Sequence, residues 1–309
     1  MTYEEKIIEI AAANQRVVVM TAENRSAIRR VPAALGDRFI DVGIAEQTLV
    51  GAAAGLALRG RIPIAHGIAA FLTMRAFEFI RSDAGIAGLP VKFVGWQPGL
   101  LSEANGPTHQ AIEDVALMRA IPGMEIFCPA DNAELANAMT AIVDRPDPCY
   151  IRFNSSEPVV SHSAGQEYGR AELISGGSDV SIMVYGFLLR EAIKAVAILK
   201  GCGVSVRLVN MRTLNPLDED AVVACAEITR LVVTIEDHLL TGGLYTGVVE
   251  TLQRRRTFCE LRPIAIAGRW FKPALLEDAI NYEGFSGEHL ASKIMRYLEQ
   301  MPGRMRAVQ

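Results

Sequence analysis

The sequence lacks the marks of several large protein classes. It contains no run of about 18 or more apolar residues, the length that a membrane-spanning helix needs. Its 31 basic and 35 acidic side chains give a net charge of -4, which does not favour nucleic-acid binding. The first residues show neither the basic start nor the apolar core of a secretory signal, so we expect a cytoplasmic protein.

Metal-binding and nucleotide-binding motifs are also missing. The five cysteines are scattered and form no C-x-x-C pair, which fits reduced thiols rather than disulfides or a zinc site. No strand is followed by G-x-G-x-x-G, and there is no P-loop, G-x-S-x-G turn or H-E-x-x-H helix. The sequence thus predicts no metal ligands and no Rossmann-type or P-loop nucleotide site.

What is present is a large apolar fraction, 50% of 309 residues, in alternating short and long runs. At roughly 100–200 residues per domain, this length indicates two domains. The alternation is typical of an α/β fold, with a mainly parallel sheet between two helical layers. In the first half, strands are expected at 16–20, 38–42, 62–66, 91–95, 125–128 and 149–152, and helices at 2–14, 45–59, 71–84, 112–119 and 132–143.

The polar segment 154–165 interrupts this alternation and is interpreted as a linker, because it contains proline and glycine. We therefore predict two three-layer α/β/α domains, at 1–160 and 161–309. In the second, strands are expected at 180–185, 205–210, 231–236 and 262–267, and helices at 189–200, 218–226, 243–255 and 289–298.

One candidate site follows the second expected strand, in Asp41-Val-Gly-Ile-Ala-Glu46-Gln47. Glu46 falls in the first turn of an expected helix, where the helix dipole stabilises a carboxylate, and this is the simpler interpretation. The helix continues as Gly51-Ala-Ala-Ala-Gly55, which permits close packing and exclusion of solvent. A desolvated Glu46 could hold a proton for a partner nitrogen.

Two further candidates also follow expected strands. His109, in Asn105-Gly-Pro-Thr-His-Gln110, could exchange a proton near neutral pH, although a lone loop histidine is more often structural. Phe71 opens an expected helix and is either a core residue or a platform for a flat heterocycle. Ligands of parallel α/β sheets bind beyond the carboxyl ends of the strands, where these loops lie.

Taken in order, these clusters resemble the pyrimidine-binding domain of transketolases and are also similar to 1-deoxyxylulose-5-phosphate synthase. The resemblance rests on 41–47, on Phe71 with Arg75-Ala-Phe77, on 106–110 and on 121–129. Further motifs resemble the C-terminal domain of the same family: Tyr185-Gly-Phe187, 209–217, Glu236-Asp-His238 and Gly242-Gly243. The sequence Gly-Pro-Thr-His-Gln separates the chain from the beta subunits of 2-oxo-acid dehydrogenases.

The resemblance implies the cofactor thiamine diphosphate and a role for each candidate. Glu46 matches the glutamate that hydrogen-bonds the aminopyrimidine ring, Phe71 matches the aromatic that stacks on that ring, and Ile44 matches a cofactor contact. His109 matches a histidine that touches an oxygen of the donor sugar. Arg152 matches an arginine that binds the distal phosphate of the substrate.

Several residues differ from the family pattern at substrate-binding positions, so the resemblance does not identify the sugar substrate. Asn105 stands where an aspartate usually reads a substrate hydroxyl, and Gln97 stands where transketolases often have a phosphate-binding histidine. We still expect both residues to face the substrate. Ile68 replaces a first phenylalanine, and the N-terminal helix has no evident arginine for the phosphate.

The sequence also lacks the Gly-Asp-Gly and Asn-Asn motif with which complete transketolases hold Mg²⁺ and the diphosphate of the cofactor. The resemblance therefore implies one subunit of a split transketolase, which transfers a two-carbon ketol unit between sugars. Such a subunit would need an N-terminal partner, in an α2β2 assembly. Two alternatives stay open: a split deoxyxylulose-phosphate-synthase-like or acyloin-forming enzyme with a 2-oxo acid donor, and a non-catalytic regulatory subunit.

Overall fold

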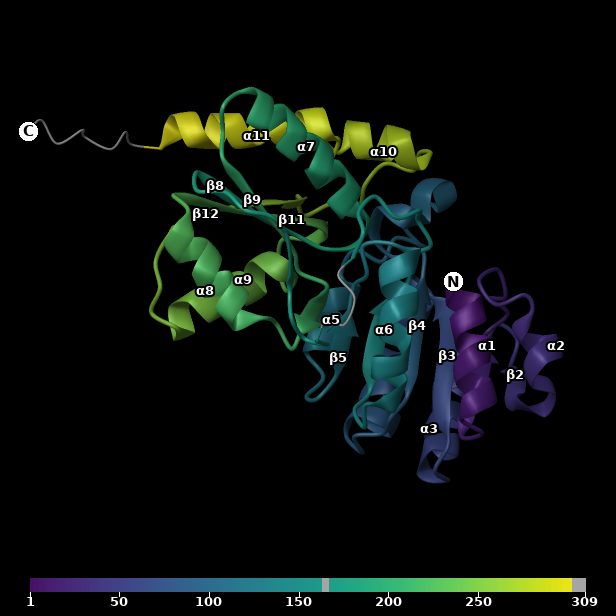
Figure 1. Cartoon of the computed structure of the whole chain (residues 1–309). Coiled ribbons are helices and arrows are strands. Elements are labelled where there is room, and N and C mark those ends of the chain that lie inside the picture. Colours follow the sequence, from purple (N-terminus) through teal and green to yellow (C-terminus); the bar gives the residue numbers. More distant parts are fainter. Residues whose placement is uncertain (163–166, 302–309) are drawn as a thin grey trace, which may run out of the picture.

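The computed structural model describes residues 1–162 and 167–301; the last expected linker residues, 163–165, lie outside these ranges. This part of the chain forms two sheets with helices on both faces (Figure 1). The larger sheet has the strand order β10-β5-β6-β4-β3-β1-β2, and the smaller has the order β12-β11-β8-β9-β7. Most neighbouring strands are parallel, which confirms the predicted α/β class.

The larger sheet consists of β1 (Val17–Thr21), β2 (Phe39–Asp41), β3 (Ile62–Ile68), β4 (Lys92–Trp96), β5 (Glu125–Phe127), β6 (Cys149–Arg152) and β10 (Thr213–Asn215). The smaller sheet consists of β7 (Glu172–Ser175), β8 (Val180–Val184), β9 (Val206–Asn210), β11 (Leu231–Leu239) and β12 (Glu260–Ile266).

The α-helices are α1 (Tyr3–Ala13), α2 (Val31–Leu35), α3 (Glu46–Leu58), α4 (Phe77–Phe79), α5 (Asp114–Arg119), α6 (Asn132–Asp144), α7 (Leu189–Gly201), α8 (Glu219–Ile228), α9 (Leu244–Arg254), α10 (Leu276–Tyr282) and α11 (Gly287–Gln300). The 3₁₀ and π-helical turns are η1 (Gly36–Arg38), η2 (Phe71–Arg75), η3 (Ile80–Gly85), η4 (Gly99–Asn105) and η5 (Gly186–Leu188).

Local sequence explains why these elements form where they do. All five residues of β1 are buried, as expected for a parallel strand covered on both faces. Helix α1 starts with a capping box, in which Thr2 and Glu5 each accept a hydrogen bond from the backbone N–H of the other. The expected helix at 71–84 is instead built from π-helical turns on either side of α4, and π-helical turns are frequent at functional sites.

The chain contains several short elements that the sequence did not predict. Strands β7 and β10 pair antiparallel with β9 and β5, and they are too short to show a periodic apolar pattern. Helices α2 and α10 were also missed. The pairing of β10 with β5 means that a strand from after residue 160 completes the sheet of the first domain.

The apolar core consists of clusters on the two faces of each sheet, and one of these clusters contains residues of both domains. Helices α1 and α6 pack on one face of the larger sheet, and α3, η3 and α5 pack on the other. The smaller sheet is covered by α7 and α11 on one face and by α8 and α9 on the other (Figure 1). One buried cluster runs from Met118 and Ile126 of the first domain to Val222 and Leu244 of the second. Within the described ranges, no helix is long and apolar enough to span a bilayer.

Candidate active site

The predicted site residues follow strands that end at one edge of the larger sheet. Strands β1, β2, β3, β4 and β6 run parallel, so their carboxyl ends meet at the same edge. The turn before Glu46 follows β2, Phe71 follows β3, and His109 is reached from β4 through η4. The topology therefore brings together residues that are far apart in the sequence.

Glu46 is buried at this edge. It is the first residue of α3 and is 2% exposed. The turn before it needs Gly43, whose φ of 73° lies in the left-handed region that favours glycine. Gly67 of β3 packs beside it, since a Cβ added there would be in van der Waals contact with Glu46 Cγ, at 3.9 Å. The backbone thus places a carboxylate inside the protein.

Arg75 connects Glu46 to the two other candidates. Its Nη1 donates a hydrogen bond to Glu46 Oε2 at 3.0 Å, and its guanidinium carbon lies 4.3 Å from the centre of the Phe71 ring. His109 meets the same ring edge-on, with ring centres 4.9 Å apart. We call Glu46, Phe71, Arg75 and His109 the site cluster. Sequence reasoning gave Arg75 no role, although it lies four residues after Phe71.

The site cluster fits the aminopyrimidine end of thiamine diphosphate. That ring is flat and carries N–H donors, so it needs an aromatic face and a buried acceptor. The guanidinium of Arg75 is also flat and donates N–H groups, and it contacts the ring of Phe71 and the carboxylate of Glu46 at once. Its position shows that a planar donor is accommodated between these two side chains.

Three further predicted contact residues make no hydrogen bond or ring contact with the site cluster in the described structure. Ile44 is 72% exposed and is accessible from outside the chain. Asn105 Nδ2 donates to the carbonyl oxygen of Ser102 at 2.8 Å, within its own loop. Gln97 lines a small pocket at the end of β4. Substrate contact by Asn105 and Gln97, and cofactor contact by Ile44, remain predictions.

Arg152 makes buried contacts that the sequence did not predict. Its side chain is 4% exposed and donates to Asp114 Oδ2 at 2.9 Å and to Asp237 Oδ1 at 2.6 Å. Asp237 belongs to β11 of the second domain, so the arginine joins the two domains. Buried carboxylates hold its guanidinium in this structure, and its contact with a substrate phosphate remains a prediction.

The Glu236-Asp237-His238 motif lies at the same domain interface. Glu236 accepts hydrogen bonds from the N–H groups of Leu244 and Tyr245 at the start of α9. Burial raises the pKa of Glu236 to about 8, against the opposing effect of these N–H groups. His238 Nε2 accepts from the N–H of Ala116 of the first domain at 3.3 Å. The motif therefore connects the domains.

A loop of the second domain also reaches the site edge. Gln110 Nε2 donates to the carbonyl oxygen of Phe271 at 2.8 Å. A Cβ added to Gly106 would lie 3.7 Å from Pro273 Cγ. Residues 271–273 thus support the Gly-Pro-Thr-His loop from outside the first domain. Nothing in the spacing of the sequence indicates this contact.

A second polar cluster lies beside the linker. The ring nitrogens of His162 lie 2.7 Å from Asp131 Oδ2 and 2.7 Å from Glu172 Oε2. Glu134 is nearby, and with His162 and Glu172 it forms a geometry that could hold a cation. Burial alone would lower the pKa of His162, but the hydrogen bonds that its ring donates to Asp131 and Glu172 raise it to about 10. A doubly donating imidazolium ion therefore explains this cluster.

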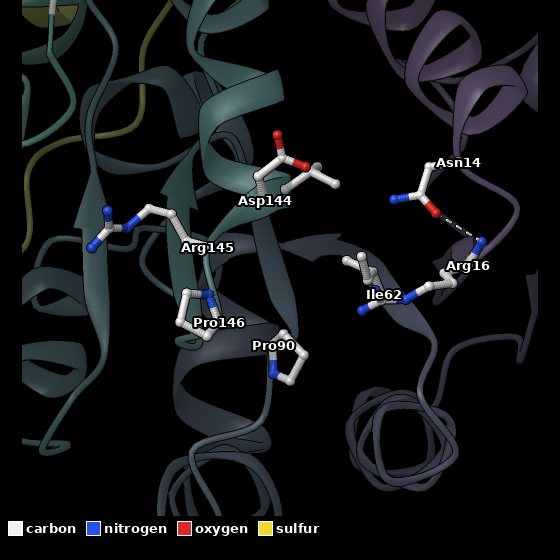
Figure 2. Close-up of a pocket in the computed structure, with 8 residues that line it drawn as sticks. Asn14, Arg16, Ile62, Pro90, Asp144, Arg145 and Pro146 are labelled. Atoms are coloured by element: carbon white, nitrogen blue, oxygen red, sulfur yellow. Dashed lines mark hydrogen bonds between the residues drawn. The ribbon is translucent and has the colours of Figure 1, made fainter.

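The cavity drawn in Figure 2 lies at the opposite edge of the larger sheet. It measures about 290 Å³ and is lined by Asn14, Arg16, Ile62, Pro90, Val143, Asp144, Arg145 and Pro146. Ile62 is the first residue of β3, so this edge carries the amino ends of the parallel strands. The cavity therefore lies away from the edge where the site cluster is found.

Comparison with known proteins decides the family. The family "Transketolase, pyrimidine binding domain" matches residues 1–158, and "Transketolase, C-terminal domain" matches residues 169–283. The chain belongs to the transketolase family. The resemblance predicted from the sequence is confirmed, and the two sheets are those of the pyrimidine-binding and C-terminal domains.

Several relatives of this transketolase chain have a similar length. The 6-deoxy-6-sulfo-D-fructose transketolase subunit SqwH of a Clostridium species is 38% identical over 255 residues, which cover 81% of this chain and 79% of the relative. A putative transketolase C-terminal section of Methanocaldococcus jannaschii is 31% identical over 96% of this chain and 95% of its own. The chain spans 48% of the 1-deoxy-D-xylulose-5-phosphate synthase of Thermomicrobium roseum, to which it is 33% identical.

Solved structures agree with this assignment. A split gene transketolase, described as an inactive beta4 tetramer, superposes with a TM-score of 0.87 and 31% identity, over 96% of this chain and 97% of the other. A transketolase from Pichia stipitis superposes with a TM-score of 0.78 and 16% identity, over 97% of this chain and 46% of the other. The second likeness is one of fold.

Proposed function

We propose that the chain is the pyrimidine-binding and C-terminal subunit of a cytoplasmic, two-component transketolase that depends on thiamine diphosphate and transfers a two-carbon ketol unit from a ketose to an aldose. The observation that carries the proposal is the site cluster, in which a buried carboxylate, an aromatic ring and an imidazole meet at the carboxyl edge of the sheet.

Each residue of the cluster has a task in this proposal. Glu46 accepts a hydrogen bond from the aminopyrimidine and exchanges a proton with it, and Phe71 supports the ring. His109, from the neighbouring loop, faces the sugar and donates to or accepts from an oxygen at the reacting carbons. Thiamine diphosphate, when bound, supplies the nucleophilic carbon for cleaving and forming the carbon–carbon bond.

A partner subunit completes the site in this proposal. The sequence has no Gly-Asp-Gly and Asn-Asn motif for the diphosphate and Mg²⁺, so the partner must supply those groups. The similar split gene transketolase is described as an inactive tetramer of one kind of subunit, which supports the need for a second kind. Ile44 and Leu58, at the two ends of α3, are 72% and 70% exposed and are available for assembly into an α2β2 complex.

The test is reconstitution with a purified diphosphate-binding transketolase subunit. The isolated chain should show no tight, Mg²⁺-dependent binding of thiamine diphosphate in calorimetry, whereas the mixture should bind it and cleave a ketose. Submicromolar binding by the isolated chain would contradict the division of the site. Release of carbon dioxide from pyruvate, without ketose cleavage, would instead favour a synthase like the deoxyxylulose-phosphate relatives.

A further inference from the structure

A small pocket opens beside the loop that carries His109. It measures about 140 Å³ and is formed where β4 and β6 end and where η4 begins its approach to Gly106. We call it the tail pocket. It is lined by Trp96, Gln97, Leu101, Glu103, Phe153, Asn154, Ser155 and Ser156.

Backbone strain is concentrated at this pocket. Gln97 has a φ of 55° and Glu103 a φ of 50°, in the region that residues with a Cβ rarely adopt. In the described part of the chain, two other non-glycine residues have a positive φ, namely Glu23 and Arg256. Strained residues persist where the surrounding structure enforces them, and they gather at ligand sites.

The tail pocket combines an aromatic wall with uncommitted polar groups. The rings of Trp96 and Phe153 lie 4.5 Å apart at 30° and present apolar surface. Within the described ranges, the side chains of Gln97, Glu103 and Ser155 make no hydrogen bond to protein, and neither does the hydroxyl of Ser156. These groups can both donate to and accept from a ligand rich in hydroxyls.

The charge of the pocket excludes one class of ligand. Among its described lining residues none is lysine or arginine, and its one ionisable side chain is the carboxylate of Glu103. A phosphate or sulfonate placed here would find no cation and would be repelled by Glu103. A hydroxyl would donate to that carboxylate and accept from the amide of Gln97.

The pocket has room for more than a water molecule. Its volume of about 140 Å³ is well above the roughly 10–15 Å³ that one buried water needs on the same measure, so the end of a hydroxylated ligand can enter it.

We propose that the tail pocket binds the end of an unphosphorylated sugar that points away from the reacting carbons, and that it discriminates against phosphate and sulfonate. This inference rests on the proposed function and names its substrate class: neutral ketoses and aldoses. Ser155, an exposed side chain at the rim, is the position at which a cation would reverse the preference.

The experiment uses Trp96 as a reporter that is independent of catalysis. The protein has two tryptophans, and the other, Trp270, is 60% exposed outside the pocket, so Trp270→Phe leaves Trp96 alone. The full-length variant is titrated with D-xylulose, D-xylulose 5-phosphate and 6-deoxy-6-sulfo-D-fructose. D-xylulose should change the Trp96 emission, and the two anionic sugars should bind at least about tenfold more weakly.

A matched pair of substitutions tests the electrostatic argument. Ser155→Arg should strengthen binding of the phosphorylated sugar by about ten- to a hundredfold, as expected for a new hydrogen bond to a charged group. Ser178→Arg adds the same charge at an exposed serine of the second domain and should change nothing.

The outcomes separate this inference from the proposed function. Equal or tighter binding of D-xylulose 5-phosphate by the parent, or no response of Trp96 to any sugar, overturns the inference. A complex that cleaves ketoses but prefers phosphorylated ones leaves the transketolase assignment intact. If the chain binds D-xylulose in this pocket but cleaves no ketose with a partner subunit, the transketolase activity is contradicted and the sugar-binding role of the pocket is supported.

Discussion

Arg75 Nη1 lies 3.0 Å from Glu46 Oε2 and joins the start of α3 to η2. The carboxylate side chain is 3% exposed, whereas the arginine side chain is 43% exposed. A cofactor ring that used both Glu46 and Phe71 would have to take the place of the guanidinium. In the proposed function Arg75 would therefore compete with the cofactor ring, and its exposed side gives it solvent into which it can move.

Arg75→Ala should strengthen the binding of thiamine diphosphate to the assembled complex. The cofactor would no longer have to break a partly exposed ion pair and a cation–π contact, which together correspond to about two- to thirtyfold in affinity. Calorimetry with parent and variant complexes measures the difference. Unchanged or weaker binding would mean that Arg75 keeps Glu46 in position instead of competing with the ring.

Glu46→Gln should lower kcat by about 10²–10⁴-fold while keeping the side-chain shape. An amide can hydrogen-bond the ring but cannot exchange a proton with it, and general acid–base catalysis contributes an effect of that size. Glu78→Gln, on an exposed glutamate of α4, is the matched control and should retain full activity. Steady-state turnover of a ketose measures both variants. A fully active Glu46→Gln complex would mean that Glu46 only stabilises the start of α3 and takes no part in catalysis.

Arg152→Met should destabilise the chain by about 3–5 kcal/mol, because it leaves Asp114 and Asp237 without their buried cation. The exposed pair of Arg262 with Glu260 offers a control, since Arg262→Met should cost less than about 1 kcal/mol. Urea unfolding gives both values. If Arg152→Met were as stable as the parent and only raised KM for a phosphorylated sugar, the predicted contact of Arg152 with a substrate phosphate would be supported.

The His162 cluster makes the stability depend on pH. The folded pKa of His162 is raised from 6.5 to about 10, so its contribution is complete below pH 6.5 and is lost as the pH rises toward 10. The groups around it are Asp131, Glu134, Glu172 and Arg212. The free energy of unfolding should therefore fall across this range in the parent.

His162→Gln should remove that slope and cost about 1.5–3 kcal/mol at pH 6.5, the value of hydrogen bonds to a charged group. His289→Gln, at an exposed histidine of α11, should leave the profile unchanged. Urea titrations at several pH values compare the three proteins. A parent profile that is flat between pH 6.5 and 10 would argue for a neutral His162, and added Zn²⁺ that stabilised the parent alone would argue for a metal site.

The sequence predicted the features that depend on local pattern. Long apolar or amphipathic runs located the main strands and helices, and the order of motifs located Glu46, Phe71 and His109 at one sheet edge. It failed where partners are distant. The ion pair of Arg152 with Asp237 was missed, because Asp237 lies 85 residues away in the second domain.

The same limit explains the other features that were missed. The role of Arg75 depends on the wide winding of η2, which residue spacing does not indicate. The contact of Gln110 with Phe271 spans 161 residues. Short strands such as β7 and β10 exist because a neighbouring edge offers hydrogen bonds, not because of their own sequence.

The place of β10 matters for how the protein is made. Thr213 and Asn215 pair with Phe127 and Ile126 of β5, so the edge of the first sheet is closed by residues that a ribosome adds much later. Until then, the nascent first domain presents β5 with an open row of backbone N–H and C=O groups, which other strands can use. The sheet of the first domain therefore cannot be completed when residues 1–160 have been synthesised. It is completed only after β10, which lies in the second half of the chain, has been added.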